Sequence, residues 1–228
     1  MIDNPPLLTI HRGFVRPDPA LVAAFRGAQT SHLCDAMEGR GALDWRIKPL
    51  DPENASFVGP AMTAHAYPAD IVAMFGALAE AQPGDVIVCA NDSFTATAVF
   101  GDLAAGMMHN KGVAAFVTDG LARDKAGIIA TGLAVFCQGI SPNSPARNGP
   151  GVVGAPVTLA GVHVCPGDII VGDADAVVVI PQGRATEVLA RLREIQAAER
   201  ETEQKVRDGL TMPGFMTDII AHARILGS

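Results

Sequence analysis

Residues 83–118, PGDVIVCANDSFTATAVFGDLAAGMMHNKGVAAFVT, decide the fold class. Two short apolar runs within this stretch, residues 86–90 and 113–118, have the composition of buried strands. Between them, residues 95–110 are rich in Ala and Met and predict a helix, which Lys111-Gly112 closes. Helices that alternate with strands are typical of layered α/β domains. The stretch therefore predicts an α/β protein.

On the N-terminal side, the sequence predicts an extended arm followed by helices and a strand. Residues 1–18 contain three prolines, with Pro19 directly after them, so we expect an arm without regular structure. Pro19 can occupy the first turn of a helix that Asp18 caps and that ends near Gly27. The other elements predicted here are a helix over 31–38, a strand over 57–64 and a helix over 70–79.

On the C-terminal side, the pattern changes at Gly132 into a series of short apolar strands separated by turns, which continues to Pro181. The spacing leaves no room for helices. The predicted strands cover residues 134–137, 151–157, 162–164, 168–171 and 176–180. No change of composition marks a linker, so residues 1–228 are interpreted as one domain.

Residues 185–228 predict a helical extension that leaves the core. A long helix over 185–208 carries an apolar stripe on its first half only. Beyond Gln196 the helix is polar on all sides, which indicates that its end is not covered by its own core. A second, apolar helix over 214–226 must pack on another surface. A neighbouring subunit and a fold back onto the same subunit are the two alternatives.

The composition excludes several classes of protein. Hydrophobic residues make up 49% of the 228 residues and charged residues 18%, which excludes a disordered chain. The net charge of −7 argues against a nucleic-acid partner. We expect a cytoplasmic protein without a membrane segment, since no signal sequence and no apolar run of about 18 residues occur. Four scattered cysteines lack the spacing of a zinc site and are expected to be free thiols: Cys34, Cys89, Cys137 and Cys165.

The residues best suited to chemistry follow the apolar run 113–118. A Thr118-Asp119-Gly120 turn leads to Arg123 and Asp124. The guanidinium group of Arg123 offers planar donors to a carboxylate or enolate oxygen, and the Asp124 carboxylate is a hard ligand for Mg²⁺ or Mn²⁺. On this short motif alone, a solvated ion pair beside a turn is the favoured interpretation. Arg147, in a loop rich in Pro and Gly, is a candidate for binding a distal carboxylate or phosphate.

A series of motifs spread over residues 31–208 resembles the RraA-like family. This family includes the class II pyruvate aldolases that act on 4-hydroxy-4-methyl-2-oxoglutarate and 4-carboxy-4-hydroxy-2-oxoadipate. The motifs are residues 35–41, 58–64, 83–88, 101–103, 119–124, 156–157, 164–168 and 173–181. The resemblance implies a β/β/α sandwich similar to the phosphohistidine swivelling domain. It also implies a homotrimer or homohexamer with active sites between subunits.

The aldolase branch of the family implies roles for individual residues. Asp124 would bind the divalent metal, and Arg123 would contact the keto and enolate oxygen of the substrate. The turn formed by Gly101, Asp102, Leu103 and Ala104 would present backbone N–H groups to the pyruvyl carboxylate, as the start of a helix can. A water molecule held near Asp102 is the candidate base.

The resemblance also implies that a glutamate on the long C-terminal helix of a neighbouring subunit approaches the water molecules of the metal. Glu199 is the candidate, because it lies where the helix has lost its apolar stripe. Glu201 and Glu203 are alternatives. One departure concerns Ala69-Asp70-Ile71, where several relatives have Gly-Asp-Asn. An isoleucine near the pocket would change the substrate preference, so the natural substrate stays open.

The resulting hypothesis is a divalent-metal-dependent aldolase that cleaves a 4-hydroxy-2-oxo acid into pyruvate and a second oxo acid. Oxaloacetate decarboxylation is expected as a side activity. The first alternative is a non-catalytic regulator of RNA degradation that binds an endoribonuclease or helicase. Regulators of that branch lack the metal-binding aspartate, which this chain has at Asp124. The second alternative is a class I aldolase, for which lysine candidates are few. A methyltransferase is disfavoured because no glycine-rich nucleotide loop occurs.

Overall fold

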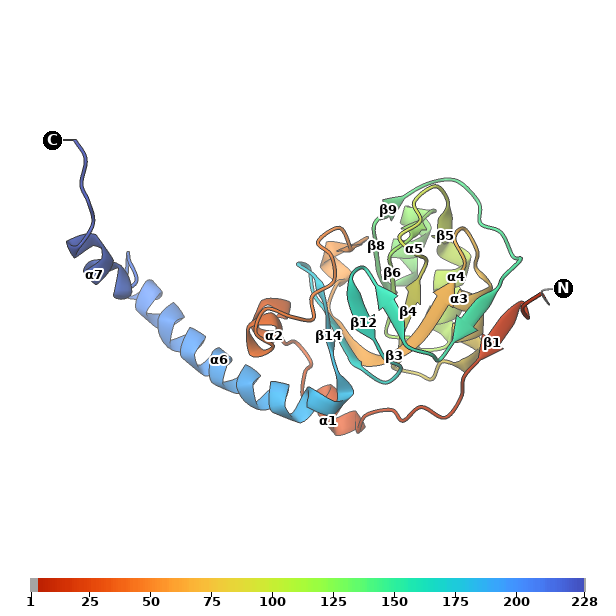
Figure 1. Cartoon of the computed structure of the whole chain (residues 1–228), viewed down its shortest axis with the longest axis horizontal. Helices are drawn as coiled ribbons and strands as arrows, with labels where there is room; N and C mark the ends of the chain where they lie inside the picture. Colours follow the sequence, from red (N-terminus) through yellow and green to blue (C-terminus); the bar gives the residue numbers. More distant parts are fainter. Residues whose placement is uncertain (1–3, 228) are drawn as a thin grey trace.

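Strand β3 (Phe57–Ala66) joins the layers of the protein in the computed structural model, which describes residues 4–227 (Figure 1). The second half of β3 pairs in parallel with β4 (Val86–Ala90) and antiparallel with β10 (Gly151–Val153). The first half of β3 pairs antiparallel with β13 (Ile169–Gly172). One long strand therefore takes part both in the main sheet and in the strands that lie against it.

The main sheet supports the helices that build the site. In spatial order it contains β1 (Leu8–Ile10), β10, β3, β4, β6 (Ala115–Thr118), β8 (Ala134–Cys137) and β2 (Lys48–Pro49). Strands β3, β4, β6 and β8 run parallel, so each connection between them must cross over the sheet. The crossovers contain helices α3 (Val72–Glu80), α4 (Asp102–Asn110) and α5 (Lys125–Thr131). Figure 1 shows these helices together on one side of the molecule.

Each strand of the sheet interior is apolar on both faces, because both faces are covered. On the helix side, the rings of Phe100 and Phe116 stack with centroids 4.1 Å apart, and Met74, Met108 and Ile128 pack in the same core. On the other side, the core includes residues of β3, β4, β6, β8 and β13 and of three strands not yet introduced. These are β11 (Val157–Leu159), β12 (Val162–Val164) and β14 (Val177–Ile180). The expected α/β class is confirmed, with a β layer, the main sheet and a helix layer in succession.

A third apolar cluster lies between the β13–β14 hairpin and a second group of helices. These are α1 (Pro19–Ala23), α2 (Thr30–Ala36) and α6 (Ala185–Arg207). The predicted cap of α1 is confirmed, since Asp18 Oδ1 accepts a hydrogen bond of 2.8 Å from the Ala20 N–H. Short 3₁₀ turns occur at Pro52–Asn54 and Gln182–Arg184.

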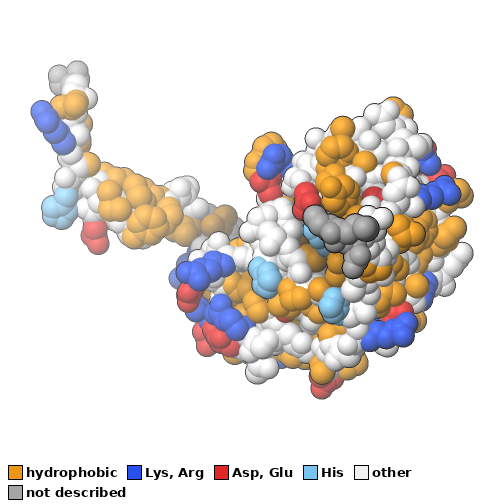
Figure 2. All heavy atoms as spheres, turned by 45° about the vertical axis from the view of Figure 1, so that its right-hand side comes forward, with side chains coloured by type: hydrophobic (Ala, Val, Ile, Leu, Met, Phe, Trp, Pro, Cys, Tyr) orange, Lys and Arg blue, Asp and Glu red, His pale blue; other side chains and the backbone are white. Residues whose placement is uncertain are grey.

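The C-terminal extension leaves the core as predicted. The buried residues of α6, Ala185, Val188 and Leu192, all lie in its first half, and the residues beyond Ile195 and Gln196 are exposed. Helix α7 (Phe215–Ala221) is shorter than the predicted 214–226, and its Phe215 side chain is 65% exposed. Figure 1 shows α6 and α7 projecting away from the sheets, and Figure 2 shows hydrophobic side chains gathered along this projection. Within residues 4–227, no helix has the length and apolar character needed to cross a bilayer.

The expectation of an arm without regular structure over residues 1–18 is wrong in part. Residues 8–10 form β1 at the edge of the main sheet, parallel to β10. The Gly151 N–H donates to Leu7 O at 3.0 Å, and the His11 N–H donates to Val153 O at 2.8 Å. The strand forms because Leu8 packs against the core on the helix side.

The predicted helix over 95–110 is also wrong in its first part. Residues 98–100 form β5 (Ala98–Phe100), which pairs in parallel with β7 (Leu121–Ala122), and β7 pairs in parallel with β9 (Gly139–Ile140). Gly101 is extended, and the helix begins only at Asp102. Residues 98–100 are a strand because they pair with β7. The sequence pattern did not predict this, since β7 lies about twenty residues further along the chain.

Two further differences concern the second half of the chain. Helix α5 was not predicted; Gly132, with φ of +75°, ends it. The strand predicted over 151–157 is split into β10 and β11 at Gly154, where φ is +73° and a Cβ atom would lie 2.1 Å from His11 O. A residue with a side chain does not fit at this position, because the backbone of the N-terminal segment passes beside it.

Candidate functional site

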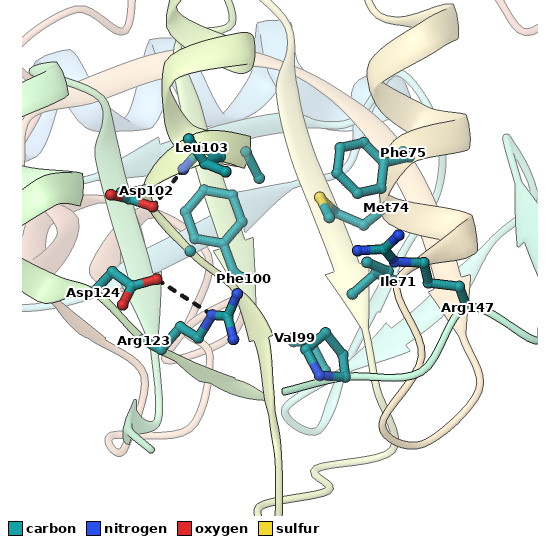
Figure 3. A pocket seen from close by; sticks show the side chains of 13 residues that line it. Ile71, Met74, Phe75, Val99, Phe100, Asp102, Leu103, Arg123, Asp124 and Arg147 are labelled. Atoms are coloured by element: carbon teal, nitrogen blue, oxygen red, sulfur yellow. Dashed lines mark hydrogen bonds and ion pairs between the residues drawn. The ribbon is translucent and has the colours of Figure 1, made fainter. Parts of the chain in front are cut away.

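A pocket opens where the ends of β5 and β7 meet the starts of α3 and α4 (Figure 3). It encloses about 520 Å³, including the part that is open to solvent. Its walls come from four separate stretches of the chain. The lining residues are Ile71, Met74, Phe75, Val99, Phe100, Gly101, Asp102, Leu103, Ala104, Arg123, Asp124, Pro145 and Arg147.

The pocket has a charged end where α4 and α5 begin close together. If Gly101 carried a Cβ atom, that atom would lie 3.0 Å from Asp124 Oδ2. A Cβ atom at Gly127 of α5 would lie 2.7 Å from Asp102 Oδ2. Glycines at these two positions therefore let Asp102 and Asp124 lie against the backbone of the facing segment. Sequence reasoning missed Gly127, because nothing in the pattern of the short helix α5 distinguishes it.

Asp124 presents its carboxylate to this end of the pocket. It lies just before α5 with φ of +59°, and its side chain makes no capping hydrogen bond to the helix. Its backbone is in the left-handed region, which aspartate and asparagine tolerate better than most residues. The side chain is 46% exposed, and Oδ2 lies 3.2 Å from Arg123 Nε. The sharp turn thus leaves the carboxylate accessible to a ligand.

Arg123 is held on both sides. Its backbone N–H donates to Phe100 O at 2.9 Å, and its Nη1 donates to Ser144 Oγ at 2.6 Å. Together with the Nε contact to Asp124, these bonds fix the direction of the guanidinium plane. The remaining N–H donors are available to an oxygen in the pocket. Ser144 was not singled out from the sequence.

The first turn of α4 completes the charged end. The Leu103 N–H donates to Asp102 Oδ1 at 2.7 Å, and the Ala105 N–H donates to Gly101 O at 3.0 Å. An anion that binds the Leu103 N–H would therefore have to displace the Asp102 carboxylate from it.

Arg147 lies on the side of the pocket opposite Arg123 and Asp124 (Figure 3). A buried carboxylate, Asp70, holds the loop that carries it. Asp70 accepts hydrogen bonds from the Asn148 N–H at 2.5 Å, the Gly149 N–H at 3.0 Å and the Val72 N–H at 2.7 Å. Asp70 therefore joins this loop to the start of α3. The position of an aspartate just before a helix is the sequence signal for such a role.

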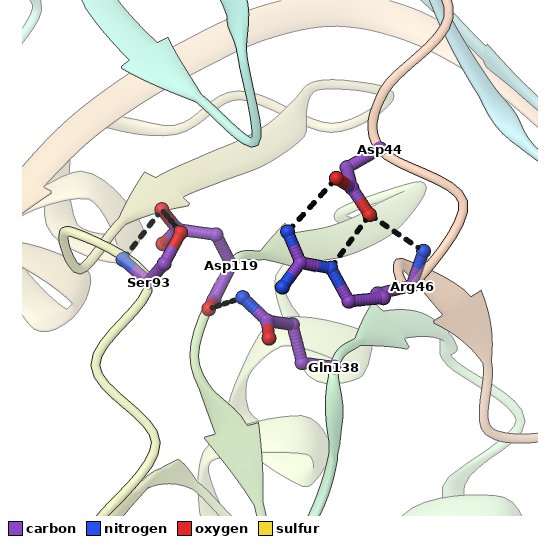
Figure 4. A network of polar contacts seen from close by, with 5 residues as sticks. All are labelled: Asp44, Arg46, Ser93, Asp119 and Gln138. Carbon is purple, nitrogen blue, oxygen red and sulfur yellow. Dashed lines mark hydrogen bonds and ion pairs between the residues drawn. The ribbon is translucent and has the colours of Figure 1, made fainter.

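A second polar network is centred on Asp119, in the turn that follows β6 (Figure 4). The buried Asp119 carboxylate accepts from the Asn91 N–H at 2.6 Å and the Ser93 N–H at 2.9 Å. Burial raises the pKa of Asp119 above its ordinary value, and these hydrogen bonds oppose the shift. Gln138 Nε2 donates to Asp119 O at 2.7 Å. Asp119 is therefore a structural residue that ties the end of β6 to the segment leading into β5.

The Asp44–Arg46 pair in the same view is separate from that network. Arg46 Nε donates to Asp44 Oδ1 at 2.8 Å, and Arg46 lowers the pKa of Asp44 to about 2. A second hydrogen bond, from Arg46 Nη2 to Asp44 Oδ2, joins the same two side chains within the loop before β2. The pair is a surface feature and not part of the pocket.

Most of the residues proposed from the sequence are brought together. Within the pocket lie Gly101, Asp102, Leu103, Ala104, Arg123, Asp124 and Arg147. Glu199 is outside it; its carboxylate contacts the ring of the buried His32 of α2 in the same chain. Figure 1 shows α6 and α2 on the opposite side of the molecule from α4 and α5. Glu199 cannot reach the pocket of its own chain.

The donors in the pocket suit a hard divalent cation. Within the described residues, no group of three or more His, Cys, Asp or Glu side chains could hold a metal ion by itself. Asp124, with Asp102 lining the same pocket, supplies carboxylate oxygens only. Mg²⁺ is commonly bound by one or two carboxylates, with water and substrate oxygens completing the shell. The four cysteines are free thiols outside the pocket, which agrees with their prediction as free.

The chain is similar to known proteins of one family. The RraA-like family model, described as Aldolase/RraA, matches residues 30–179. A protein of Halalkalibacterium halodurans, provisionally named a 4-hydroxy-4-methyl-2-oxoglutarate aldolase, is 38% identical over 189 residues, covering 83% of this chain and 90% of the relative.

Two solved structures are similar over most of the chain. An uncharacterized protein of Pseudomonas syringae aligns with a TM-score of 0.76 and 26% identity, covering 87% of this chain and 97% of that one. RraAS2 of Streptomyces coelicolor, described as an unusual member of the RNase ES inhibitor RraA family, aligns with a TM-score of 0.75 and 28% identity, covering 83% and 100%.

Proposed function

Since the chain belongs to the RraA-like family, we propose that it is a class II aldolase that cleaves a 4-hydroxy-2-oxo acid into pyruvate and a second oxo acid. The observation that carries the proposal is the Asp124 carboxylate, which faces the pocket without capping α5 and lies beside the Arg123 guanidinium group. The similarity to the Halalkalibacterium halodurans protein that is provisionally named an aldolase supports it.

Asp124 would hold Mg²⁺ or Mn²⁺. Asp102 lines the same pocket but is not assigned as a ligand of the cation. When bound, the divalent cation supplies a concentrated positive charge that stabilises negative charge developing on the keto oxygen of the substrate. Arg123 adds hydrogen-bond donors for the same oxygen, and its contact with Ser144 keeps these donors oriented before the substrate binds. The N–H groups of the first turn of α4 would bind the C1 carboxylate.

The cleavage needs one proton transfer before the bond breaks and one after it. A base removes the proton of the C4 hydroxyl, C4 becomes a carbonyl carbon, and the electron pair of the C3–C4 bond forms the pyruvate enolate. Protonation at C3 then gives pyruvate. Water held by Asp102 is the proposed base, because Asp102 is the carboxylate of the pocket that is not assigned to the cation. Oxaloacetate decarboxylation would pass through the same enolate with loss of CO₂.

Removal of divalent metal with EDTA is expected to stop pyruvate release from 4-hydroxy-4-methyl-2-oxoglutarate, and added Mg²⁺ or Mn²⁺ is expected to restore it. Protein that has been treated with borohydride in the presence of the substrate and then freed of both is expected to keep its activity, because none of the lining residues is a lysine. A coupled assay of pyruvate measures both. Activity that resists EDTA and is lost with borohydride would instead identify a class I aldolase.

The likeness to RraAS2 favours a second candidate function, regulation of RNA degradation. A protein with that function alone would release no pyruvate from any 4-hydroxy-2-oxo acid. It would lower the activity of an endoribonuclease in a defined cleavage assay. Pyruvate release that depends on Asp124 separates the two functions, because a regulator does not need an exposed carboxylate in a pocket.

We further propose that the active form is a homotrimer or homohexamer in which Glu199 serves the pocket of a neighbouring subunit. The exposed second half of α6 and the exposed apolar side chains of α7 support a subunit contact there. Mixing the inactive variants Asp124→Asn and Glu199→Gln under conditions of subunit exchange is expected to restore part of the activity. Full activity of Glu199→Gln alone, or of a monomer in sedimentation, would contradict the proposal.

A further inference from the structure

The middle of the pocket, between the charged end and Arg147, is made of hydrocarbon. Val99 and Phe100 form its floor and are 1% and 3% exposed. Ile71 and Met74 form the wall on the side of α3, and Figure 3 shows them with Phe75 between Arg147 and the charged end. Among the lining residues, the only polar side chains are the charged ones at the two ends: Asp102, Arg123, Asp124 and Arg147.

The backbone and the buried carboxylate next to this wall are already engaged. The Ile71 N–H donates to Ala146 O at 3.3 Å, and the Phe75 N–H donates to Ile71 O at 3.2 Å. The Asp70 carboxylate accepts hydrogen bonds from three backbone N–H groups of the same region. A charged or hydroxyl-bearing substituent placed over Ile71 would therefore find no hydrogen-bond partner in this wall, and exchanging water for hydrocarbon is unfavourable for such a group.

These observations lead to a statement about the substrate that rests on the proposed aldolase function. We propose that the pocket selects 4-hydroxy-2-oxo acids whose C4 carries a hydrocarbon substituent, and that Ile71 is the residue that excludes a charged substituent there. The pyruvyl part would lie at the charged end and the substituent over Ile71 and Met74. A terminal carboxylate of the substrate would lie toward Arg147, across the apolar wall.

Two substrates that differ at C4 test the selection. 4-Hydroxy-4-methyl-2-oxoglutarate carries a methyl group there, and 4-carboxy-4-hydroxy-2-oxoadipate carries a carboxymethyl group. Cleavage of the methyl substrate gives two molecules of pyruvate, and cleavage of the carboxymethyl substrate gives one pyruvate and one oxaloacetate. Initial rates of pyruvate release, corrected for this stoichiometry, give kcat/KM for each. The protein as it stands is expected to favour the methyl substrate by roughly ten-fold or more, because a buried polar group without a partner is rejected by such factors.

The pair Ile71→Val and Ile71→Thr isolates the chemical character of the wall, because valine and threonine have almost the same shape. Ile71→Val is expected to keep the preference. Ile71→Thr, which adds a hydroxyl to the wall, is expected to lower the ratio of the two kcat/KM values roughly ten-fold, and Ile71→Asn to lower it further. The melting temperature of each variant shows that it is folded, and Ile10→Thr, at an exposed edge-strand position outside the pocket, is the matched control.

Two failures are distinguishable. If the protein releases no pyruvate from either substrate, the aldolase function is wrong and the selection with it. If pyruvate is released but the carboxymethyl substrate is equal or better, or if Ile71→Thr and Ile71→Val have the same ratio, the aldolase function stands and the role of Ile71 is overturned.

Discussion

Replacement of Asp124 by asparagine is expected to reduce metal-dependent pyruvate release by roughly a hundred- to a thousand-fold while the protein stays folded. Asparagine keeps the size of the side chain and tolerates the left-handed backbone at this position, where φ is +59°. It removes the negative charge that a divalent cation needs. Binding of Mn²⁺ measured by calorimetry is expected to be lost together with the activity.

Comparison with Asp124→Ala separates the loss of the carboxylate, which affects activity, from the strain of the left-handed backbone, which affects stability. Alanine is expected to lose the activity equally and, in addition, to destabilise the fold by about 1–2 kcal/mol, because it adopts the left-handed region less readily. Asp35→Asn, at an exposed position of α2 outside the pocket, is the matched control and is expected to behave as the unchanged protein. Full activity of Asp124→Asn at limiting Mg²⁺ would contradict the role of Asp124.

Replacement of Arg123 by lysine is expected to lower kcat and kcat/KM together, by roughly a hundred-fold, although the charge is kept. Arg123 donates a hydrogen bond to Ser144 through Nη1 and forms an ion pair with Asp124 through Nε at the same time, and its other donors stay in the same plane. A lysine ammonium group is a single point of donation and cannot satisfy two neighbours and a substrate oxygen in a fixed plane. Steady-state kinetics of pyruvate release measures the effect.

Two further variants give the prediction its controls. Arg46→Lys changes an exposed arginine that pairs with Asp44 outside the pocket, and it is expected to have no effect on turnover. Ser144→Ala removes one hydrogen bond to Arg123 and is expected to cost about 1 kcal/mol of transition-state stabilisation, or roughly five-fold in kcat/KM. If Arg123→Lys changes only KM, Arg123 anchors the substrate and does not act on the enolate.

Elements that depend on local pattern alone were predictable. Strand β4 and strand β8 coincide with the predicted residues 86–90 and 134–137, and α6 ends within one residue of its prediction. These strands are buried on both faces and are therefore uninterrupted apolar runs. Helix α6 could be predicted because its apolar stripe and its polar second half are both visible in the sequence.

Elements that depend on distant partners were not. Residues 98–100 resemble the start of the helix that follows, and only the pairing with residues 121–122 makes them a strand. The site shows the same division. Arg123 and Asp124 are adjacent in the sequence, whereas the neighbourhood of Asp102 and Gly127, and the hold of Asp70 on Asn148 and Gly149, arise only from the fold.

The pairing of β1 with β10 has a consequence for how the protein is made. The ribosome synthesises the chain from the N-terminus, so residues 8–10 emerge long before residues 151–153, with which they pair. The first half of β3 also lacks its partner at first, because residues 169–172 emerge after residues 151–153. During translation these strand edges have no partner within the chain, and unpaired strand edges are the places where separate chains can join. The loop of Arg147 emerges just ahead of β10, so the pocket and the sheet are completed in the same late interval.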